Sequence, residues 1–403
     1  MSNLRERALA LHKEHRGKLH VNVKMPVNDG NDLSLVYSPG VAEPCKEIAE
    51  DPEKIYDYTS KSNLVGVVSN GSAVLGLGNI GAGASMPVME GKAALFKEFA
   101  GLDAFPICLD ESDPEKLIQT IKMLEPTFGG INLEDIAAPD CFLIEQRLKE
   151  EMNIPVFHDD QHGTAIVTAA GLINALRIVD KKVENIKVVI NGAGSAGVAV
   201  TKLLRTIGIN NIIICDSIGP IYKGRTERMT PVKEELAELT NSQGVQGSLE
   251  DATIGADVFI GVSVAGALTQ EMVEVMSEDS IIFAMANPVP EIMPAEALAA
   301  GAKVIGTGRS DLPNQVNNVL AFPGIFRGAL DCRASTINEE MKLAAVYGIA
   351  DLIPEWELSP EYIIPQPFDK RVVPAVRGAV IEAAINSGAA LLKKGNESVK
   401  TGI

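Results

Sequence analysis

The sequence contains few cysteines and no CxxC pair. Its five cysteines, Cys45, Cys108, Cys141, Cys215 and Cys332, are scattered over 403 residues. Because their number is odd, they cannot form a complete disulfide framework, and the pattern is typical of buried thiols in a reducing cytosol. We therefore expect a cytoplasmic protein that is stabilised by apolar cores rather than by disulfide bonds.

Long apolar runs are also missing. No stretch of about 18 apolar residues occurs, which is the length that a membrane-spanning helix needs. The segment from Met1 to Lys18 mixes Arg, Glu, His and Lys and lacks the apolar core of an export signal. The sequence therefore predicts neither membrane spanning nor export.

Positive charge is scarce. The chain has 36 Lys and Arg against 53 Asp and Glu, a net charge of −17. Such an acidic surface repels the phosphates of nucleic acids and anionic lipid headgroups, so we expect neither as a partner. It also repels small anionic metabolites, so an anionic substrate would require local cations or a metal ion at its site.

Short apolar runs alternate with longer helix-patterned segments. At roughly 150 residues per domain the length predicts two or three domains, and 46% hydrophobic with 22% charged residues is typical of soluble globular proteins. Alternating β and α units with nearly continuous apolar strands indicate parallel sheets covered on both faces, so the predicted fold class is α/β. The predicted strands are Leu64–Ser69, Ala104–Leu109, Ile154–His158, Lys187–Asn191, Asn211–Cys215, Ala256–Val262, Ser280–Ala286 and Lys303–Gly306.

Three segments are predicted along the chain. A helical pattern over Thr164–Ile178 leads into the charged stretch Asp180-Lys181-Lys182, which places the first boundary near Gln161–Asp180. Strand signals fade after Pro323, and Ala329–Ala350 and Val372–Lys394 are predicted as helices. We expect an N-terminal α/β domain over 1–160, a second α/β domain over 161–325, and a helical segment over 326–403 that packs back on the body.

A glycine loop opens the second domain. The strand Lys187–Asn191 runs into Gly192-Ala193-Gly194-Ser195-Ala196-Gly197 and then into a predicted helix over Val198–Ile207. GxGxxG alone is a weak signal, but here a further strand follows and ends in Asp216, about 20 residues beyond the loop, where a ribose-binding acid is expected. We predict a Rossmann-type, doubly wound parallel sheet that binds a dinucleotide at the helix N-terminus; the alternative is a tight turn without a ligand.

A second GxGxxG occurs at Gly76–Gly81, again after an apolar strand. Gly83 and Pro87 interrupt the turns where a phosphate-binding helix should begin, so we expect that helix to start at Pro87. From the residues alone this loop is either a rival dinucleotide loop or a turn that shapes another part of the site.

Two pairs of adjacent carboxylates follow predicted strands or turns. They are Glu134-Asp135 and Asp159-Asp160. Adjacent carboxylates repel one another unless a cation compensates, and oxygen ligands select Mg²⁺ or Mn²⁺; solvated surface charge and helix capping are the alternative. His158 and His162 have HxxxH spacing, but Gly163 and the strand-to-helix change favour a structural or supporting role over a zinc site.

Lys92 and Tyr37 are candidates for proton transfer. Lys92 lies near the predicted start of an apolar helix, where loss of hydration and the helix dipole would lower its pKa toward use as a base; a surface lysine is the alternative. Tyr37 lies in Ser34–Gly40, a turn-forming segment, where its phenol faces a site or packs in the loop.

Seven segments together resemble the malic enzyme family in its short bacterial form. They are Ser34–Cys45, Val65–Phe99, Pro126–Ile136, Phe157–Ala165, Gly192–Gly197, Ala286–Glu291 and Thr307–Phe326. These matches span nearly the whole chain in order. The resemblance implies that residues 1–160 bind malate and a metal ion and that residues 161–325 bind NAD or NADP.

The resemblance also implies roles for individual residues. Tyr37 matches the general acid and Lys92 the general base, which also contacts substrate. Glu134, Asp135 and Asp160 match ligands of Mg²⁺ or Mn²⁺, with Asp159 in a supporting role. Asn287 and Asn318 match positions that contact substrate or, for Asn287, the nicotinamide. Gly192–Gly197 and Asp216 then bind the coenzyme, and Gly76–Gly81 falls on the substrate side.

The implied reaction is (S)-malate + NAD(P)⁺ → pyruvate + CO₂ + NAD(P)H. Two alternatives are a metal-dependent hydroxy-acid dehydrogenase or oxaloacetate decarboxylase, and a catalytically silent dinucleotide sensor. Ala73 replaces an Arg of larger members, which leaves open the cation for the malate carboxylate, with Arg309 a candidate. The coenzyme preference also stays open, because Asp216 favours NAD by charge while Lys223, Arg225 and Arg228 follow closely. A homodimer is implied, and Tyr37 acts in its own or in the neighbouring subunit.

Overall fold

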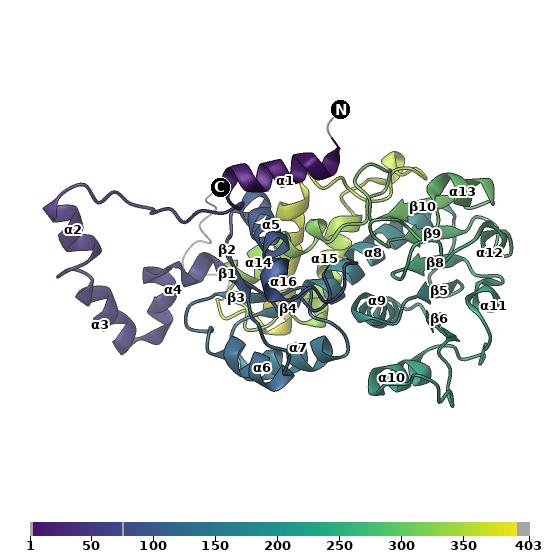
Figure 1. The fold of residues 1–403 in the computed structure, drawn as a ribbon, viewed down its shortest axis with the longest axis horizontal. Helices are drawn as coiled ribbons and strands as arrows, with labels where there is room; N and C mark the ends of the chain where they lie inside the picture. Colours follow the sequence, from purple (N-terminus) through teal and green to yellow (C-terminus); the bar gives the residue numbers. More distant parts are fainter. Residues whose placement is uncertain (1–2, 75, 393–403) are drawn as a thin grey trace.

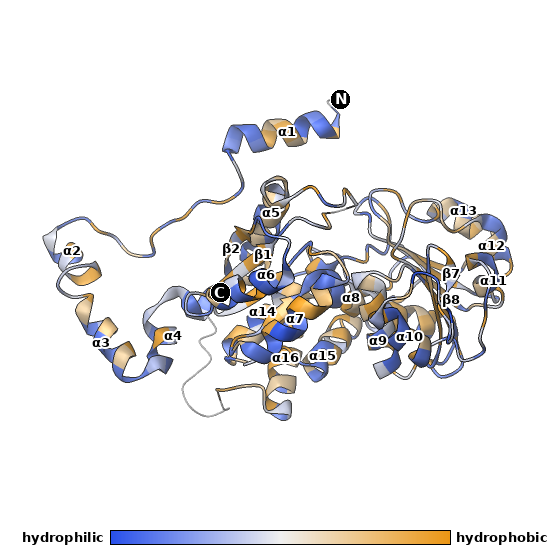
Figure 2. Ribbon diagram, turned by 60° about the horizontal axis from the view of Figure 1, so that its bottom comes forward, coloured by the Kyte–Doolittle hydropathy of each residue, from blue (hydrophilic) through white to orange (hydrophobic). Residues whose placement is uncertain are grey.

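The chain forms a two-sheet body with a helical arm at its N-terminal end (Figure 1). The computed structural model describes residues 3–74 and 76–392. The arm contains α2, α3 and α4, which project away from the sheets in Figures 1 and 2. The N-terminal helical elements are α1 (Leu4–His15), α2 (Gly30–Val36), α3 (Ala42–Glu50), η1 (Pro52–Lys54), α4 (Ile55–Tyr58) and η2 (Ser60–Asn63).

The first sheet has four parallel strands in the order β2-β1-β3-β4. They are β1 (Leu64–Ser69), β2 (Asp103–Cys108), β3 (Gly130–Leu133) and β4 (Val156–His158). Side chains of α5 (Ala82–Ala100) bury one face, and those of α6 (Pro114–Lys122) and α7 (Asp140–Glu151) bury the other. The sequence did not predict β3, because a four-residue strand that contains Gly130 and Asn132 carries little apolar signal.

The second sheet has six strands in the order β10-β9-β8-β5-β6-β7, and only the short β7 is antiparallel. The strands are β5 (Lys187–Asn191), β6 (Asn211–Asp216), β7 (Gly219–Pro220), β8 (Val258–Gly261), β9 (Ile281–Ala284) and β10 (Val304–Thr307). Val188 and Ile190 point into one core and Val189 into the other, as expected for a strand that is buried on both faces. Every predicted strand is present, with ends that differ by two residues at most.

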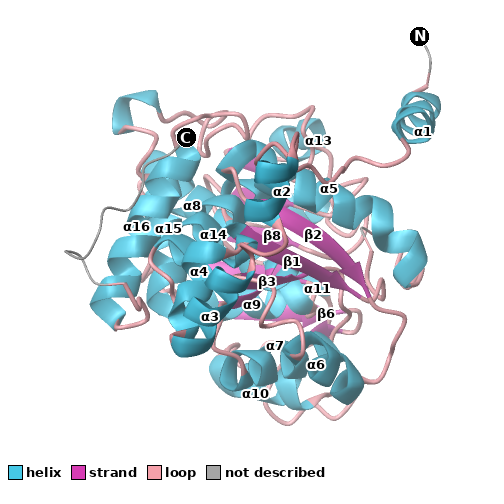
Figure 3. Ribbon diagram, turned by 90° about the vertical axis from the view of Figure 1, so that its left-hand side faces the viewer, coloured by secondary structure: helices cyan, strands magenta, loops and turns pink. Residues whose placement is uncertain are grey.

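Helices cover both faces of the second sheet, which confirms the doubly wound arrangement (Figure 1). Figure 3 shows the first sheet in front of the second, seen from the side of the arm. On one side lie α8 (Asp159–Ile178), α9 (Ser195–Thr206) and α10 (Pro231–Leu239). On the other side lie α11 (Leu249–Thr253), α12 (Gln270–Glu274) and α13 (Pro294–Ala299).

The C-terminal helices pack back on the body, as predicted. They are η3 (Asn318–Leu320), α14 (Phe322–Asp331), α15 (Glu339–Ala350), η4 (Glu355–Glu357) and α16 (Val372–Ser387). Phe322 and Phe326 of α14 contact the ring of Phe96 on α5, so one apolar core joins this segment to the first sheet.

Two helix predictions in this region are wrong. The helix predicted over Ala329–Ala350 is interrupted, because Asn338 caps a new helix, α15, by accepting the N–H of Met341. The helix predicted over Val372–Lys394 ends at Ser387, where Gly388 adopts the left-handed conformation. The last two residues of that prediction, 393 and 394, lie outside the described part of the chain.

The predicted start of α5 at Pro87 is also wrong. The helix begins at Ala82, and Pro87 lies inside it. Proline lacks an N–H and crowds the carbonyl four residues earlier, which usually ends a helix. Here Ser85 and Met89, on either side of Pro87 in the helix, are fully buried, so packing against the sheet outweighs the local preference.

The proposed domain boundaries remain predictions. The boundary after residue 160 falls in the first turn of α8, and the one after residue 325 falls within α14. Among the residues that the structure describes, no helix is both long and apolar enough to cross a bilayer.

Candidate active site

Three carboxylates converge at the carboxyl edge of the first sheet. Glu134 and Asp135 follow β3, and Asp160 lies in the first turn of α8, directly after β4. Because β3 and β4 are adjacent and parallel, their ends bring these residues together. One oxygen atom from each lies within 4.8 Å of those of the other two, and no other such group of ligands occurs among the described residues.

The carboxylates are crowded and partly dehydrated. Burial raises the pKa of Glu134 to about 8, although the charge of Lys92 opposes it. Burial, with the neighbouring charge of Asp135, raises the pKa of Asp160 to about 7. Asp135 itself has a left-handed backbone (φ 54°), a conformation that is held at a cost for a residue other than glycine. An all-oxygen set under mutual repulsion fits Mg²⁺ or Mn²⁺.

Lys92 lies directly beside this set. Its Nζ is 2.5 Å from Oδ2 of Asp159 and 2.9 Å from Oε1 of Glu134, and it stands 4.3 Å from the centre of the Phe322 ring. The side chain is 10% exposed, so the predicted alternative of a surface lysine does not apply.

The predicted lowering of the Lys92 pKa is wrong for this structure. Burial does lower it, but the charges of Asp159 and Glu134 outweigh burial and hold the pKa above its ordinary value. Lys92 is also in the middle of α5, because the helix begins at Ala82, so the helix dipole has little effect on it.

Asn318 joins the same group. Its Nδ2 donates to Oδ2 of Asp159 at 2.7 Å. A side chain at Gly163 would place Cβ 1.9 Å from Oδ1 of Asp159 and 2.9 Å from Cβ of Asn318, so this approach requires glycine. The structure therefore brings Lys92, Asp159 and Asn318 together around the carboxylates.

Asn287 lies next to the second glycine loop, Gly76–Gly81. Gly76 has a positive φ of 75°, and a Cβ there would lie 2.8 Å from the backbone oxygen of Asn287. A Cβ at Gly308 would lie 2.7 Å from Nδ2 of Asn287. The Gly76–Gly81 loop of the first half thus borders the Asn287 turn of the second half.

The loop Gly192–Gly197 follows β5, next to β8, where the strand order of the second sheet reverses. A Cβ at Gly197 would lie 1.8 Å from the backbone oxygen of Gly192, so only glycine lets α9 begin this close to the loop. The start of α9 at Ser195 places helix N–H groups at this switch point, the usual position of a pyrophosphate.

Asp216 is already engaged by cations. Arg225 donates two hydrogen bonds to its carboxylate, and Nζ of Lys233 lies 2.6 Å away. Burial raises the pKa of Asp216, but these hydrogen bonds outweigh it and hold the pKa far below its ordinary value. Its charge is therefore compensated, and the argument that it repels a ribose 2′-phosphate is weakened. Arg309, the candidate for the malate carboxylate, is paired with Asp311.

Tyr37 lies apart from this group. It ends α2 on the projecting arm and is 68% exposed. His158 and His162 do not converge on a shared site, since His162 contacts Glu145 whereas Nε2 of His158 lies 3.9 Å from Oδ2 of Asp160. Among the described residues neither histidine belongs to a candidate group of metal ligands, and the supporting role stays a prediction.

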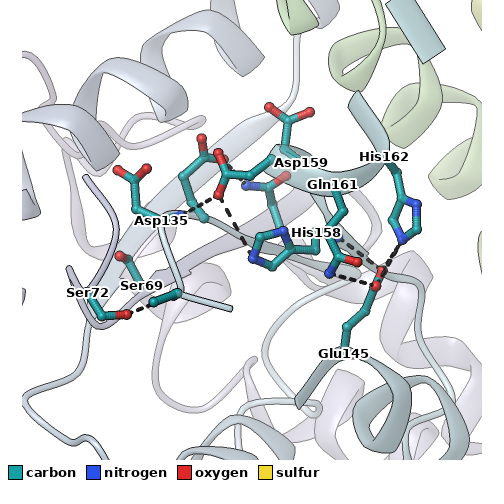
Figure 4. Close-up of polar contacts among 12 residues, drawn as sticks. Ser69, Ser72, Asp135, Glu145, His158, Asp159, Gln161 and His162 are labelled. Atoms are coloured by element: carbon teal, nitrogen blue, oxygen red, sulfur yellow. Dashed lines mark hydrogen bonds and ion pairs between the residues drawn. The ribbon is translucent and has the colours of Figure 1, made fainter. Parts of the chain in front are cut away.

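Sequence reasoning missed Glu145 and Ser72. Glu145 is buried on α7 among Cys141, Ile144 and Leu148, and a charged residue on that apolar face was the available signal. Ser72 accepts the N–H of Ala137 at 2.9 Å and so ties the loop after β1 to the loop after β3 (Figure 4).

Comparisons with known proteins identify the family. Residues 16–149 match the malic enzyme N-terminal domain, and residues 161–385 match the malic enzyme NAD binding domain. The chain belongs to the malic enzyme family. This confirms the predicted resemblance and the α/β fold.

Relatives of this malic enzyme family member match it over nearly its full length. It is 64% identical over 397 residues to a bifunctional malic/malolactic enzyme of Bacillus subtilis, with 98% of this chain and 97% of the relative covered. An NADP-dependent malic enzyme of Escherichia coli is 52% identical, with 96% of this chain and 53% of the relative covered. The crystal structure of an NAD-dependent malic enzyme from Thermotoga maritima superposes with a TM-score of 0.90 at 53% identity, covering 93% of this chain and 98% of that one.

Proposed function

We propose that this protein oxidatively decarboxylates (S)-malate to pyruvate and CO₂, reduces NAD⁺ or NADP⁺, and depends on a divalent cation. The observation that carries this proposal is the position of Lys92, held between Asp159 and Glu134 beside two further carboxylates. The names of the relatives support the substrate and the reaction.

Glu134, Asp135 and Asp160 would hold Mg²⁺ or Mn²⁺. When bound, such an ion would polarise the C2 oxygen of malate and stabilise the enolate that remains after CO₂ leaves. It would also supply positive charge for an anionic substrate on a protein with a net charge of −17.

Lys92 takes the proton of the C2 hydroxyl as hydride leaves for the nicotinamide. This role requires a neutral amine, whereas Asp159 and Glu134 stabilise the ammonium form. Because Glu134 belongs to both groups, sharing its charge with a cation weakens its hold on the ammonium and lowers the pKa of Lys92. Asn318 keeps Asp159 oriented. Asn287, which lies against Gly76 of the first half, would contact the coenzyme from the second half.

Tyr37 protonates enolpyruvate at C3, and we propose that it does so in the neighbouring subunit of a homodimer. The segment that carries it projects from the body (Figure 2). Several of its apolar side chains are exposed, and a second copy of the chain would cover them. These exposed residues are Leu33, Leu35, Val36 and Val41. A cytoplasmic location stays a prediction.

A mixing experiment tests the trans arrangement. Tyr37→Phe and Lys92→Ala are each expected to be inactive in the overall reaction, and a heterodimer of the two would contain one site with both native residues. Recovery of activity on mixing supports action in trans, and no recovery in a confirmed heterodimer contradicts it.

The overall reaction distinguishes this function from the two alternatives. Malate-dependent reduction of NAD(P)⁺ should be accompanied by CO₂ in equal amount. Reduction without CO₂ would indicate a dehydrogenase, and binding of NAD(P)H without turnover would indicate a sensor. The position of Lys92, whose side chain is 10% exposed, beside three clustered carboxylates argues against a sensor, which needs neither a base nor a metal site.

A further inference from the structure

Three hydrogen bonds join Glu145 of α7 to the junction between β4 and α8. The N–H of His158 donates to Oε1 at 3.3 Å, and Nε2 of Gln161 donates to Oε2 at 3.2 Å. Nε2 of His162 lies 2.8 Å from Oε1 and 2.9 Å from Oε2. Figure 4 shows the three residues surrounding the carboxylate, which is buried.

The orientation of the His162 ring is fixed from both sides. Lys342 of α15 lies with its Nζ 3.3 Å from Nδ1 of His162. An ammonium group can only donate, so Nδ1 accepts and Nε2 carries the hydrogen that it donates to Glu145. The Glu145 contact is therefore a directed hydrogen bond.

The three donor residues flank Asp159 and Asp160 in the sequence: His158 precedes them, and Gln161 and His162 follow them. Asp160 is a proposed metal ligand, and Asp159 holds Lys92 and Asn318. The N–H of Asp135 donates to Oδ2 of Asp160 at 2.7 Å, but the carboxylates of Asp135 and Glu134 lie within 4.8 Å and repel that of Asp160 when ionised. A second attachment of the turn that carries Asp160 would oppose this repulsion. Within the described residues, Glu145 takes hydrogen bonds from three residues of this short stretch.

We propose that Glu145 is a positioning residue that fixes the first turn of α8 and thereby holds Asp160 ready for the divalent cation. Glu145 does not touch the proposed ligands and acts through the backbone of residues 158–162. This inference rests on the proposed metal site.

The test is Mn²⁺ binding to the full-length protein without malate or coenzyme, measured from the electron paramagnetic resonance signal of free Mn²⁺. Glu145→Gln keeps the shape of the side chain but places an amide where donors point. We expect the Kd for Mn²⁺ to rise about 10- to 100-fold, as for other residues that orient metal ligands. The Kd for NADH, measured from its fluorescence, should stay within about twofold, because that site is on the second sheet.

Glu151→Gln is the matched control. Glu151 lies on the same helix and forms ion pairs with Lys122 at 2.5 Å and with Arg147, as Glu145 does with Lys149 at 3.1 Å, but neither partner of Glu151 belongs to α8. The Mn²⁺ affinity of this variant should equal that of the unmodified protein.

The outcomes separate this inference from the proposed function. Unchanged Mn²⁺ binding by Glu145→Gln overturns the positioning role, as does an equal loss of Mn²⁺ and NADH affinity, which would indicate general loosening. If Glu145→Gln does not fold, Gln161→Leu and His162→Phe each remove one donor; a weaker Mn²⁺ affinity with unchanged NADH affinity supports the role, and no change in either overturns it. Failure of the unmodified protein to bind Mn²⁺ overturns the metal site itself.

Discussion

The loops Gly76–Gly81 and Gly192–Gly197 have the same glycine spacing but use their glycines differently. In Gly192–Gly197 the third glycine is required by what lies beside it, the backbone oxygen of Gly192. In Gly76–Gly81 all three glycines have positive φ, and a Cβ on Gly78 or Gly81 would meet nothing within 4 Å. The glycines of Gly192–Gly197 allow a helix to approach the loop, and those of Gly76–Gly81 allow the backbone to turn.

The distance from the preceding strand distinguishes the two loops. Gly192 follows directly on β5, and α9 begins within the loop at Ser195. Gly76 comes well after the end of β1 at Ser69, and α5 begins only after the loop, at Ala82. A phosphate-binding loop needs strand, turn and helix in immediate succession, and this succession is more informative than the glycine letters.

The two sheet edges also differ in charge. The edge of the first sheet holds Lys92 and four buried or half-buried carboxylates, whereas that of the second holds the uncharged loop Gly192–Gly197 and one carboxylate, Asp216, paired with two cations. Under the proposed function, proton transfer and metal binding would belong to one half and coenzyme binding to the other. Four changes test this division.

The largest effect should come from Lys92→Ala. Removal of a general base typically costs about 10²- to 10⁴-fold in rate, so kcat for malate oxidation should fall by that factor while the Kd for NADH stays unchanged. The measurement is NAD(P)H absorbance under saturating malate and Mn²⁺. If the kcat of the variant stayed within about tenfold of that of the unmodified protein, this result would falsify the base assignment.

Mn²⁺ binding should depend on pH. Burial raises the pKa of Asp160 to about 7 and that of Glu134 to about 8, so protons compete with the cation for these carboxylates increasingly as the pH falls from 8 to 6. Because Mn²⁺ must displace these protons, its Kd should fall about tenfold or more from pH 6 to pH 8. NADH binding should be flat over the same range. A Kd for Mn²⁺ that does not change with pH contradicts this prediction.

Substitutions in the two loops should affect different ligands. Gly197→Ala forces the loop and α9 apart, so the KM for the coenzyme should rise about tenfold, equivalent to about 1.4 kcal/mol. Gly78→Ala strains a left-handed residue by about 1–2 kcal/mol and should alter the KM for malate instead. Steady-state kinetics with each substrate varied in turn measures both. Equal changes in the two KM values for either variant would argue against separate roles.

The smallest effect should follow Lys233→Ala. Loss of one of the two cations on Asp216 leaves its carboxylate more negative, which disfavours a ribose 2′-phosphate. The kcat/KM for NADP⁺ should fall about two- to fivefold relative to that for NAD⁺, within the range of a partly exposed ion pair. Lys223→Ala serves as a control, because Lys223 pairs with the exposed Glu238.

Strands with several buried β-branched residues could be predicted from the sequence, and short polar ones could not. The composition of Val188–Ile190 clearly predicts a strand, whereas that of Gly130-Ile131-Asn132-Leu133 predicts one only weakly. Yet the second segment is the strand that positions Glu134 and Asp135. The residues of the acidic set were predicted, but their convergence required the adjacency of β3 and β4, which depends on long-range pairing.

Electrostatic effects were the hardest to predict. A lysine in an apolar segment indicates a lowered pKa. For Lys92 two carboxylates raise the pKa instead, and they come from positions distant in the sequence, 134 and 159. The compensation of Asp216 by Lys233 is equally non-local. Predictions of where helices start and end were wrong where tertiary packing determined these positions, as for α5, which contains Pro87 in its interior.

The helix α8 joins the two chemical centres. Its first turn carries Asp159 and Asp160, and its later turns pack against α9 of the second half, with a Cβ at Gly171 lying 3.4 Å from the Phe283 ring. At 1.5 Å per residue, its 20 residues form a stiff rod about 30 Å long. Under the proposed function, the side chains that pack along this one helix would therefore help to set how far the carbon that loses hydride lies from the ring that accepts it.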